Sequence, residues 1–296
     1  MSTDGVQPPG PGTSSIADGA AGVEPGHDGG STEPALARNA DTQAEGLQAF
    51  SLAGRTALVT GVSRGIGKAI AVGLAVAGAD LILAGRAGSL DATRATVEGL
   101  GRKAATLEVD LAQPEGIADG SLDQRLPADV DILVNNAGVI HREEALAVDA
   151  RSWSRVLDVN LTSLFFLTQC VAGPMLARGR GKIINIASLL SFEGGLGVSS
   201  YAASKHAVAG LTRALSNEWA SRGLQVNAIA PGYIVTDNTA QLRADPSRLT
   251  SIGDRIPAGR WGLPSDLVGA SVFLASSAAD YVTGHVLLVD GGWSAR

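Results

Sequence analysis

Cysteine and histidine are scarce in this sequence. The single cysteine, Cys170, excludes an internal disulfide bond in a chain of 296 residues. The four histidines, His27, His141, His206 and His285, are scattered, and no cysteine pair is present that could complete a structural zinc site. We therefore expect no metal centre.

An excess of positive charge is also lacking. The chain has 23 Lys and Arg against 29 Asp and Glu, a net charge of −6. Nucleic acids and anionic membranes are bound through basic patches, so we expect neither as a partner.

Long apolar runs and a leader sequence are missing as well. Residues 1–20 contain no Lys or Arg and no apolar run, which excludes a signal peptide from our reading. The most apolar stretch, 161–176, is interrupted by Gln169 and Pro174 and is shorter than the roughly 20 residues of a spanning helix. These absences predict a soluble, cytoplasmic protein without a membrane-spanning helix.

The first 46 residues differ in composition from the rest. They hold nine Gly, five Pro, seven acidic residues and one basic residue, Arg38, and no aromatic residue. Such a segment buries too little surface to offset its ordering entropy, so we expect a disordered acidic tail at 1–46. A role in solubility or partner binding, and no role at all, both remain open. Residues 47–296 then form one domain with 22 basic and 22 acidic residues.

Within 47–296, short apolar runs alternate with helix-length segments. Near-continuous apolar runs are typical of parallel strands that are buried on both faces. The predicted strands are Thr56–Thr60, Asp80–Gly85, Ala104–Val109, Asp131–Asn135, Lys182–Ala187, Gln225–Ala230 and His285–Val289. The predicted helices are 65–78, 89–100, 143–178, 199–222 and 264–276, and a weaker one is 112–128. This rhythm predicts a doubly wound α/β fold.

A glycine-rich turn joins the first strand to the first helix. The segment Thr60–Gly67 places Gly61, Gly65 and Gly67 where the backbone must approach a ligand closely. A helix that starts there offers free N–H groups and a positive dipole end, which suit the pyrophosphate of a dinucleotide.

The ends of the next two strands bear on the choice of dinucleotide. NAD enzymes commonly place an acidic residue at the end of the second strand, and an Arg there accommodates the extra phosphate of NADP. This strand ends at Gly85-Arg86, and Arg64 in the glycine-rich turn adds a second positive charge. These side chains favour NADP. Asp110, at the end of the third strand, is placed to reach the adenine amino group or to cap a helix.

A candidate proton-transfer site follows the middle of the chain. Tyr201 and Lys205 are four residues apart and share one face of a predicted helix. A nearby ammonium group lowers the pKa of a phenol and makes it usable as an acid and base. Ser188 follows a predicted strand, and Asn160 lies in the predicted helix 143–178.

Over residues 50–296, the sequence resembles the short-chain dehydrogenase/reductase family. The resemblance rests on the glycine motif at 60–67, Asn-Asn-Ala-Gly at 135–138, Ser188, the Tyr201/Lys205 pair and Pro231-Gly232. The resemblance implies a Rossmann-type sheet of seven parallel strands and a catalytic tetrad. In it, Tyr201 is the general acid and base, Lys205 supports it and binds the nicotinamide ribose, Ser188 orients the carbonyl, and Asn160 holds a water. The implied cofactor contacts are Gly61, Ser63, Arg64, Gly65, Ile66, Gly67, Arg86, Asp110, Leu111, Asn136, Tyr201, Lys205, Pro231, Ile234 and Thr236.

Several segments are similar to one subgroup of that family. They are 141–146, 188–195, 254–264 and 289–293. The subgroup is that of the 2-dehydro-3-deoxy-D-gluconate 5-dehydrogenases, also described as 2-deoxy-D-gluconate 3-dehydrogenases. The resemblance implies a sugar-acid substrate, a homotetramer and NAD as the usual cofactor. Because Arg64 and Arg86 favour NADP, the cofactor stays open between NAD and NADP.

A sugar acid needs a partner for its carboxylate, and arginine suits this best. The candidates are Arg142, Arg243, Arg255 and Arg260, with Arg142 or Arg255 as our hypothesis. The last three lie in 237–262, a segment long enough to be a substrate lid. We expect packing or interface roles for Trp261 and Trp293, and structural roles for His141 and His206. Gluconate 5-dehydrogenase, 3-oxoacyl-thioester reductase, another alcohol dehydrogenase and a non-catalytic dinucleotide-binding regulator remain as alternatives.

Overall fold

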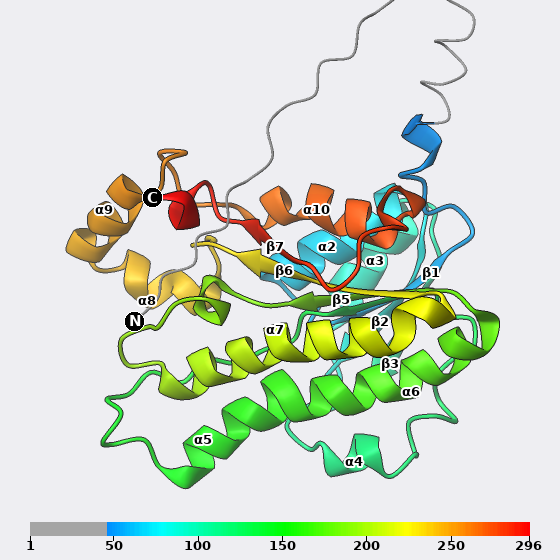
Figure 1. Cartoon of the computed structure of the whole chain (residues 1–296), viewed down its shortest axis with the longest axis horizontal. Coiled ribbons are helices and arrows are strands. Elements are labelled where there is room, and N and C mark those ends of the chain that lie inside the picture. Colours follow the sequence, from blue (N-terminus) through cyan, green and yellow to red (C-terminus); the bar gives the residue numbers. More distant parts are fainter. Residues whose placement is uncertain (1–45) are drawn as a thin grey trace, which may run out of the picture. The chain divides into compact units, whose positions relative to one another are not determined.

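A computed structural model describes residues 46–296, and these form one parallel sheet between two layers of helices (Figure 1). Seven strands lie in the order β3-β2-β1-β4-β5-β6-β7. They are β1 (Thr56–Thr60), β2 (Asp80–Gly85), β3 (Ala104–Glu108), β4 (Ile132–Asn135), β5 (Gly181–Ile186), β6 (Leu224–Pro231) and β7 (Val286–Val289). Every pair of neighbours is parallel. The predicted fold class and all seven predicted strands are confirmed.

The central strands are buried on both faces, as their apolar runs predict. All six residues of β5 and all four residues of β4 are buried. The edge strand β3 instead exposes Ala105, Thr106 and Glu108, so its alternation with polar residues reflects its place at the side of the sheet.

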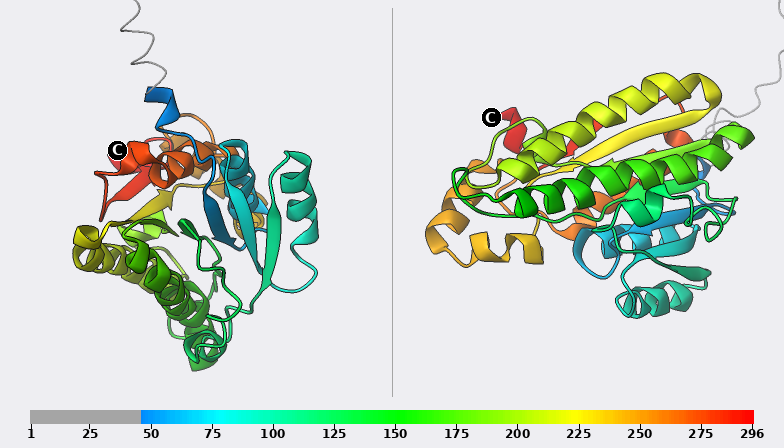
Figure 2. Two further views of the ribbon diagram at one scale, coloured as in Figure 1. Left: turned by 90° about the vertical axis from the view of Figure 1, so that its right-hand side faces the viewer. Right: turned by 90° about the horizontal axis from the view of Figure 1, so that it is seen from below.

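Helices cover both faces of the sheet (Figure 2). On one face α2 (Gly65–Val76), α3 (Asp91–Gly99) and α10 (Val268–Ala275) share a core with the sheet. On the other face lie α4 (Glu115–Ala118), α5 (Ala150–Leu157), α6 (Ser163–Arg178) and α7 (Ser199–Trp219). Leu74 of α2 and Leu167 of α6 are fully buried on opposite sides.

Among the predicted segments, three differ most from the structure. The helix predicted from 143 begins at Ala150, because the Asp149 carboxylate caps it by accepting the N–H of Ser152 at 2.7 Å. The helix predicted at 112–128 shrinks to Glu115–Ala118, in a stretch that Gly120 and Pro127 interrupt. The segment 237–262 contains α8 (Ala240–Arg243) and α9 (Pro246–Arg255). The predicted disordered tail lies outside the described residues, except for residue 46.

The apolar stretch predicted at 161–176 is part of a longer helix. In the described part of the chain, one continuous helical stretch, Ala150–Arg178, is long and apolar enough to cross a membrane. Half of its most apolar window is buried inside the protein. Val171 and Met175 pack there in the core beneath the sheet. We therefore assign this stretch to the core of the domain.

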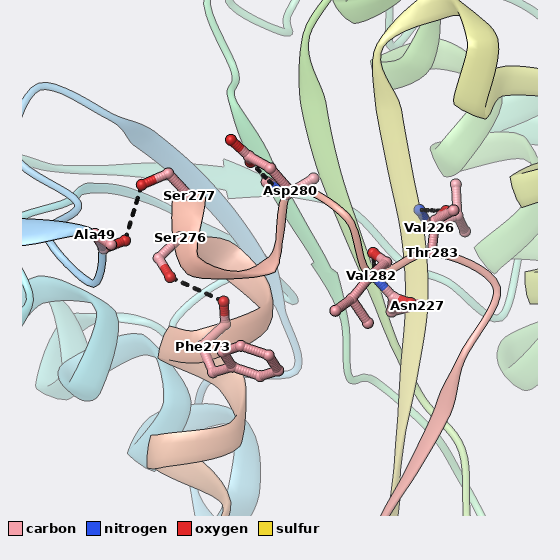
Figure 3. A network of polar contacts seen from close by, with 10 residues as sticks. Ala49, Val226, Asn227, Phe273, Ser276, Ser277, Asp280, Val282 and Thr283 are labelled. Atoms are coloured by element: carbon pink, nitrogen blue, oxygen red, sulfur yellow. Dashed lines mark hydrogen bonds and ion pairs between the residues drawn. The ribbon is translucent and has the colours of Figure 1, made fainter. Parts of the chain in front are cut away.

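The strand order determines where a ligand can bind. β1 lies between β2 and β4, so the crossovers on its two sides run in opposite directions and leave a crevice at the carboxyl ends of β1 and β4. Near the amino end of β6, polar contacts tie this strand to the segment that leads into β7 (Figure 3). There Asn227 donates to the Val282 carbonyl at 2.7 Å, and Thr283 accepts the N–H of Val226 at 3.1 Å.

Candidate active site

The glycine-rich turn lies against the end of β4. Gly61 and Gly65 have φ angles of 68° and 57°, a region that favours glycine. A Cβ atom on Gly61 would lie 2.8 Å from the Cα of Ala137, and one on Gly67 would clash with Asn136 and with the Gly61 carbonyl. No side chain therefore covers the backbone at these glycines, where helix α2 begins. The first N–H groups of that helix lack intrahelical acceptors.

Asn136 and Thr60 hold this turn in place. The Asn136 side-chain amide donates to the carbonyls of Thr60 and Gly61 at 2.9 and 3.1 Å. The Thr60 hydroxyl accepts the backbone N–H groups of Asn136 and Ala137, each at 3.0 Å. The side-chain amide of Asn136 thus shapes the cofactor turn, and a direct contact of Asn136 with the cofactor stays a prediction.

The outer part of the crevice carries the residues expected to select the dinucleotide. Arg86 follows β2 and is exposed. Arg64 is also exposed, and its Nε lies 2.7 Å from the Asp237 carboxylate. Asp110 accepts the N–H of Ala112 at 3.0 Å through Oδ1, which closes a local turn and does not cap α4, whose N-cap residue is Pro114. The hydrogen-bond donors at this end of the crevice are the backbone N–H groups at the start of α2 and the side chains of two exposed arginines. This donor set fits a dinucleotide with an additional phosphate.

Asn160 is fully buried. It lies on a π-helical turn, Asp158–Thr162, between α5 and α6. Its Oδ1 accepts the Val139 N–H at 2.8 Å, and its Nδ2 donates to the Val139 carbonyl and the Ser204 hydroxyl at 2.9 and 3.1 Å. Sequence reasoning missed Ser204, although its place between Tyr201 and Lys205 was a usable signal.

Tyr201, Lys205 and Ser188 converge at the carboxyl end of β5. Lys205 is 4% exposed, and its Nζ lies 5.7 Å from the centre of the Tyr201 ring. The same Nζ donates to the Ile186 carbonyl at 2.6 Å. Ser188 begins the short turn Leu189–Ser191 and accepts the N–H of Leu190 at 3.2 Å. The structure therefore brings the predicted tetrad together.

The pKa of Tyr201 differs from our expectation. Burial raises the pKa of Tyr201, while a hydrogen bond with the Ser188 side chain and the charge of Arg142 act to lower it. Burial also lowers the pKa of Lys205 to about 8. The expected net lowering of the Tyr201 pKa is wrong for the protein alone, because loss of water around the phenol outweighs the neighbouring charges.

The segment after β6 passes over the glycine-rich turn. Pro231 ends β6, and Ile234 is 4% exposed and pairs with Gly262. The methyl group of Thr236 would lie 3.6 Å from a Cβ on Gly65, so this backbone runs directly above the start of α2. The implied cofactor contacts Ile234 and Thr236 therefore lie on a segment that passes close to the start of α2.

The four candidate arginines have different surroundings. Arg260 is paired with Asp266 through two contacts of 2.7 and 2.9 Å, and Arg243 donates to the Thr236 carbonyl at 3.1 Å. The Arg255 guanidinium stacks 3.9 Å from the centre of the Trp293 ring. Arg142 donates to the Asn238 carbonyl at 2.9 Å, and its charge acts on Tyr201.

The two tryptophans pack against Tyr233, whereas the two histidines make local polar contacts and His206 is exposed. The Tyr233 ring lies 5.3 Å from that of Trp261 and 4.7 Å from that of Trp293. His141 contacts the Glu143 carboxylate at 2.8 Å, and His206 bonds to the Ala202 carbonyl at 3.0 Å.

A hollow of about 290 Å³ lies beside Ile234, Gly262 and Asp290. A larger one, about 510 Å³, lies on the other side of the sheet between α4 and α6, and none of the predicted site residues lines it.

The class of protein follows from three features of the site: the glycine-rich turn that suits a dinucleotide, the crevice at the ends of β1 and β4, and the group of Tyr, Lys, Ser and Asn side chains. Together they define a nicotinamide-dependent dehydrogenase. The sequence model of a family described as enoyl-(acyl carrier protein) reductase matches residues 61–294. The 2-dehydro-3-deoxy-D-gluconate 5-dehydrogenase of Bacillus subtilis (strain 168) is 56% identical over 248 residues, which are 84% of this chain and 98% of that protein. The chain therefore belongs to the short-chain dehydrogenase/reductase family.

Two solved structures are also similar to this chain. One, from Agrobacterium tumefaciens, is provisionally assigned as a 2-deoxy-D-gluconate 3-dehydrogenase and has NADP bound. It is 54% identical with a TM-score of 0.79, and the match covers 84% of this chain and 99% of that one. The other, from Beutenbergia cavernae, is provisionally assigned as an NAD(P)-dependent gluconate 5-dehydrogenase and has NADP bound at low occupancy. It is 53% identical with a TM-score of 0.81, covering 84% and 100% of the two chains.

Proposed function

We propose that this protein interconverts a ketone and a secondary alcohol on a sugar acid, with the activity of a 2-dehydro-3-deoxy-D-gluconate 5-dehydrogenase. The observation that carries the proposal is the assembled group of Asn160, Ser188, Tyr201 and Lys205 in a chain 56% identical to a protein of that name. The gluconate 5-dehydrogenase and thioester-reductase alternatives share the same chemistry and differ in substrate. A non-catalytic regulator has no need for this proton-transfer group.

The chemistry follows from the positions of the side chains. When bound, the nicotinamide cofactor supplies or accepts the hydride. Tyr201 gives a proton to the carbonyl oxygen during reduction, or takes one from the alcohol during oxidation. Ser188 bonds to the same oxygen and orients it. Lys205 places a charge near the phenol, and the bonds between Asn160 and Val139 hold the π-turn in place.

We assign NADP as the preferred cofactor. Arg64 and Arg86 are both exposed at the mouth of the crevice, and the end of β2 carries no acidic residue. The phosphate of NADP would compete with Asp237 for Arg64, because the same guanidinium cannot face both anions. Substitution of Arg64 and Arg86 by Ala should weaken NADPH binding more than NADH binding.

We assign the substrate carboxylate to Arg142. Its charge acts on Tyr201, so it lies on the substrate side of the site, whereas Arg260 is already paired with Asp266. Its bond to the Asn238 carbonyl links it to the segment 237–262, which we propose is the substrate lid. Arg255, the other candidate, stacks on Trp293 instead.

The family resemblance further leads us to propose a cytoplasmic homotetramer, in which α5 to α7 pack against a neighbouring subunit. Trp153 on α5 is 38% exposed and supports an apolar contact on that side. Sedimentation analysis of the full chain measures the state directly, and a monomer would overturn this part of the proposal.

The activity is tested by following reduced cofactor with the 2,5-diketo-3-deoxy hexonate, comparing NADPH with NADH. Turnover is expected with the wild type and should vanish in Tyr201→Phe, which keeps the ring but loses the proton. Cofactor binding should persist in that variant. Binding without turnover of the hexonate would discard this substrate, and turnover of a gluconate or a 3-oxoacyl thioester would then identify the alternative.

A further inference from the structure

Trp293 joins three parts of the molecule that are distant in the sequence. It lies in the carboxyl-terminal turn Trp293–Ala295 and is 5% exposed. It belongs to one apolar cluster with Leu189, which follows the catalytic Ser188, and with Ile256, which follows the lid helix α9. One indole therefore touches the turn of a catalytic residue and the end of the proposed lid.

The contact with the Ser188 turn is polar as well as apolar. The indole Nε1 of Trp293 donates to both carboxylate oxygens of Glu193, at 3.1 and 3.2 Å. Glu193 is half-buried in the loop that continues from Ser188 and Leu189. A donor shared between two charged oxygens is stronger than a bond between neutral groups, so it holds the loop more firmly than packing alone.

The contact with the lid is made on the face of the same ring. The guanidinium of Arg255, the last residue of α9, lies 3.9 Å from the ring centre. Such stacking of a cation on tryptophan is favourable. Two further bonds run alongside it, from the Arg296 side chain to the Asp254 carbonyl and from the Ala258 N–H to the Gly291 carbonyl, both 3.0 Å.

The backbone of the carboxyl-terminal turn is shaped for this contact. Gly291 and Gly292 have φ angles of 65° and 89°. A Cβ on Gly291 would lie 2.9 Å from Ile256, and one on Gly292 would lie 3.0 Å from Pro257. The turn therefore approaches the end of the lid as closely as glycine allows.

We propose that Trp293 is a positioning residue that couples the lid helix α9 to the Ser188 turn. The indole N–H fixes the catalytic side through Glu193, and the ring face fixes the lid through Arg255. This role goes beyond the proposed activity and does not depend on which sugar acid is bound, although it rests on 237–262 being the lid.

Trypsin measures the position of the lid without any turnover. Arg248 is an exposed cleavage site inside α9, and Arg94 is an exposed site in α3, a helix on the other side of the glycine-rich turn. In Trp293→Phe, which keeps an aromatic ring but loses the N–H, cleavage after Arg248 of the full chain should accelerate about tenfold. Cleavage after Arg94 should stay at the wild-type rate.

Two variants of Glu193 separate the bond from simple packing. Glu193→Gln keeps an oxygen that accepts the indole N–H but loses the charge, so cleavage after Arg248 should accelerate less than in Glu193→Ala. Glu193→Ala should match Trp293→Phe, and the double variant should cleave no faster than either single one. In the substrate assay, Trp293→Phe should raise KM more than it lowers kcat.

If Trp293→Phe is cleaved after Arg248 at the wild-type rate, the proposed coupling is wrong. The coupling is also wrong if cleavage after Arg94 accelerates equally, because the substitution then destabilises the whole domain. Faster cleavage at Arg248 alone, combined with no turnover of the hexonate by the wild type, would instead keep the coupling and reject the proposed substrate.

Discussion

Single residues in this site combine charge with deep burial. Lys205 is almost fully enclosed, and its ammonium group donates to the Ile186 carbonyl, so it has lost most of its water. Tyr201 is less enclosed, yet burial still dominates its ionisation. Groups of this kind cost stability in the folded protein, and their titration should report that cost.

The cost of Lys205 should be visible in unfolding experiments. Its pKa falls from 10.5 to about 8, so between these values the unfolded chain binds more protons than the folded one, and stability rises with pH. Lys205→Met removes this titration. It should therefore unfold with a free energy about 3 kcal/mol larger than the wild type near pH 7, and the difference should shrink towards about pH 10. Urea unfolding of both proteins across that range measures it, and a constant difference would contradict the expectation.

Arg142 should affect both pH dependence and substrate binding. Its charge lowers the pKa of Tyr201, so Arg142→Gln should raise that pKa. Oxidation needs the deprotonated phenol, and the pH profile of kcat/KM for oxidation should therefore move to higher pH. Loss of the charged bond to the substrate carboxylate should also raise KM about tenfold or more. Arg142→Lys, which keeps the charge, should leave the pH profile near that of the wild type. A profile that is the same in all three proteins would exclude this electrostatic role.

At the scale of elements, the turn between β1 and α2 is held by close backbone packing. Gly67→Ala places a methyl group against Asn136 and the Gly61 carbonyl, so the turn must shift. We expect a loss of about 1–3 kcal/mol in stability and a clear loss of NADPH affinity, measured by thermal unfolding and by cofactor fluorescence. Gly99→Ala at the end of α3, where nothing lies within 4 Å of the new methyl group, is the control and should change neither.

The elements themselves were well predicted, for a physical reason. A strand buried on both faces has a continuous apolar run, so β1 and β2 were predicted with their observed bounds. The candidate catalytic residues could be proposed from the sequence because motifs of local spacing specify them, and the structure brings them together. The π-turn around Asn160 was not predicted, since a change in backbone bonding leaves no side-chain pattern. The Glu193–Trp293 bond joins residues 100 positions apart, and no local signal could reveal it.

At the scale of the whole molecule, the excess negative charge and the candidate active site lie in different parts of the chain. The candidate site, the glycine-rich turn and the proposed lid all belong to residues 47–296, which have 22 charges of each sign. The net charge of −6 arises entirely in the first 46 residues, which contain seven acidic residues and one basic residue. Net charge keeps proteins apart in solution, so this segment should influence solubility more than turnover.

Deletion of residues 1–45 tests this separation. It removes all seven acids and the one base of the segment, which leaves a chain with no formal net charge. We expect kcat, KM and the unfolding temperature to stay at their full-length values, while solubility near neutral pH and low salt should fall. Replacing the seven acids by their amides in the full chain is the matched control, because it changes the charge and keeps the length. Lower solubility in both proteins would assign the effect to charge. A change in KM in the truncated protein alone would show instead that the segment reaches the active site.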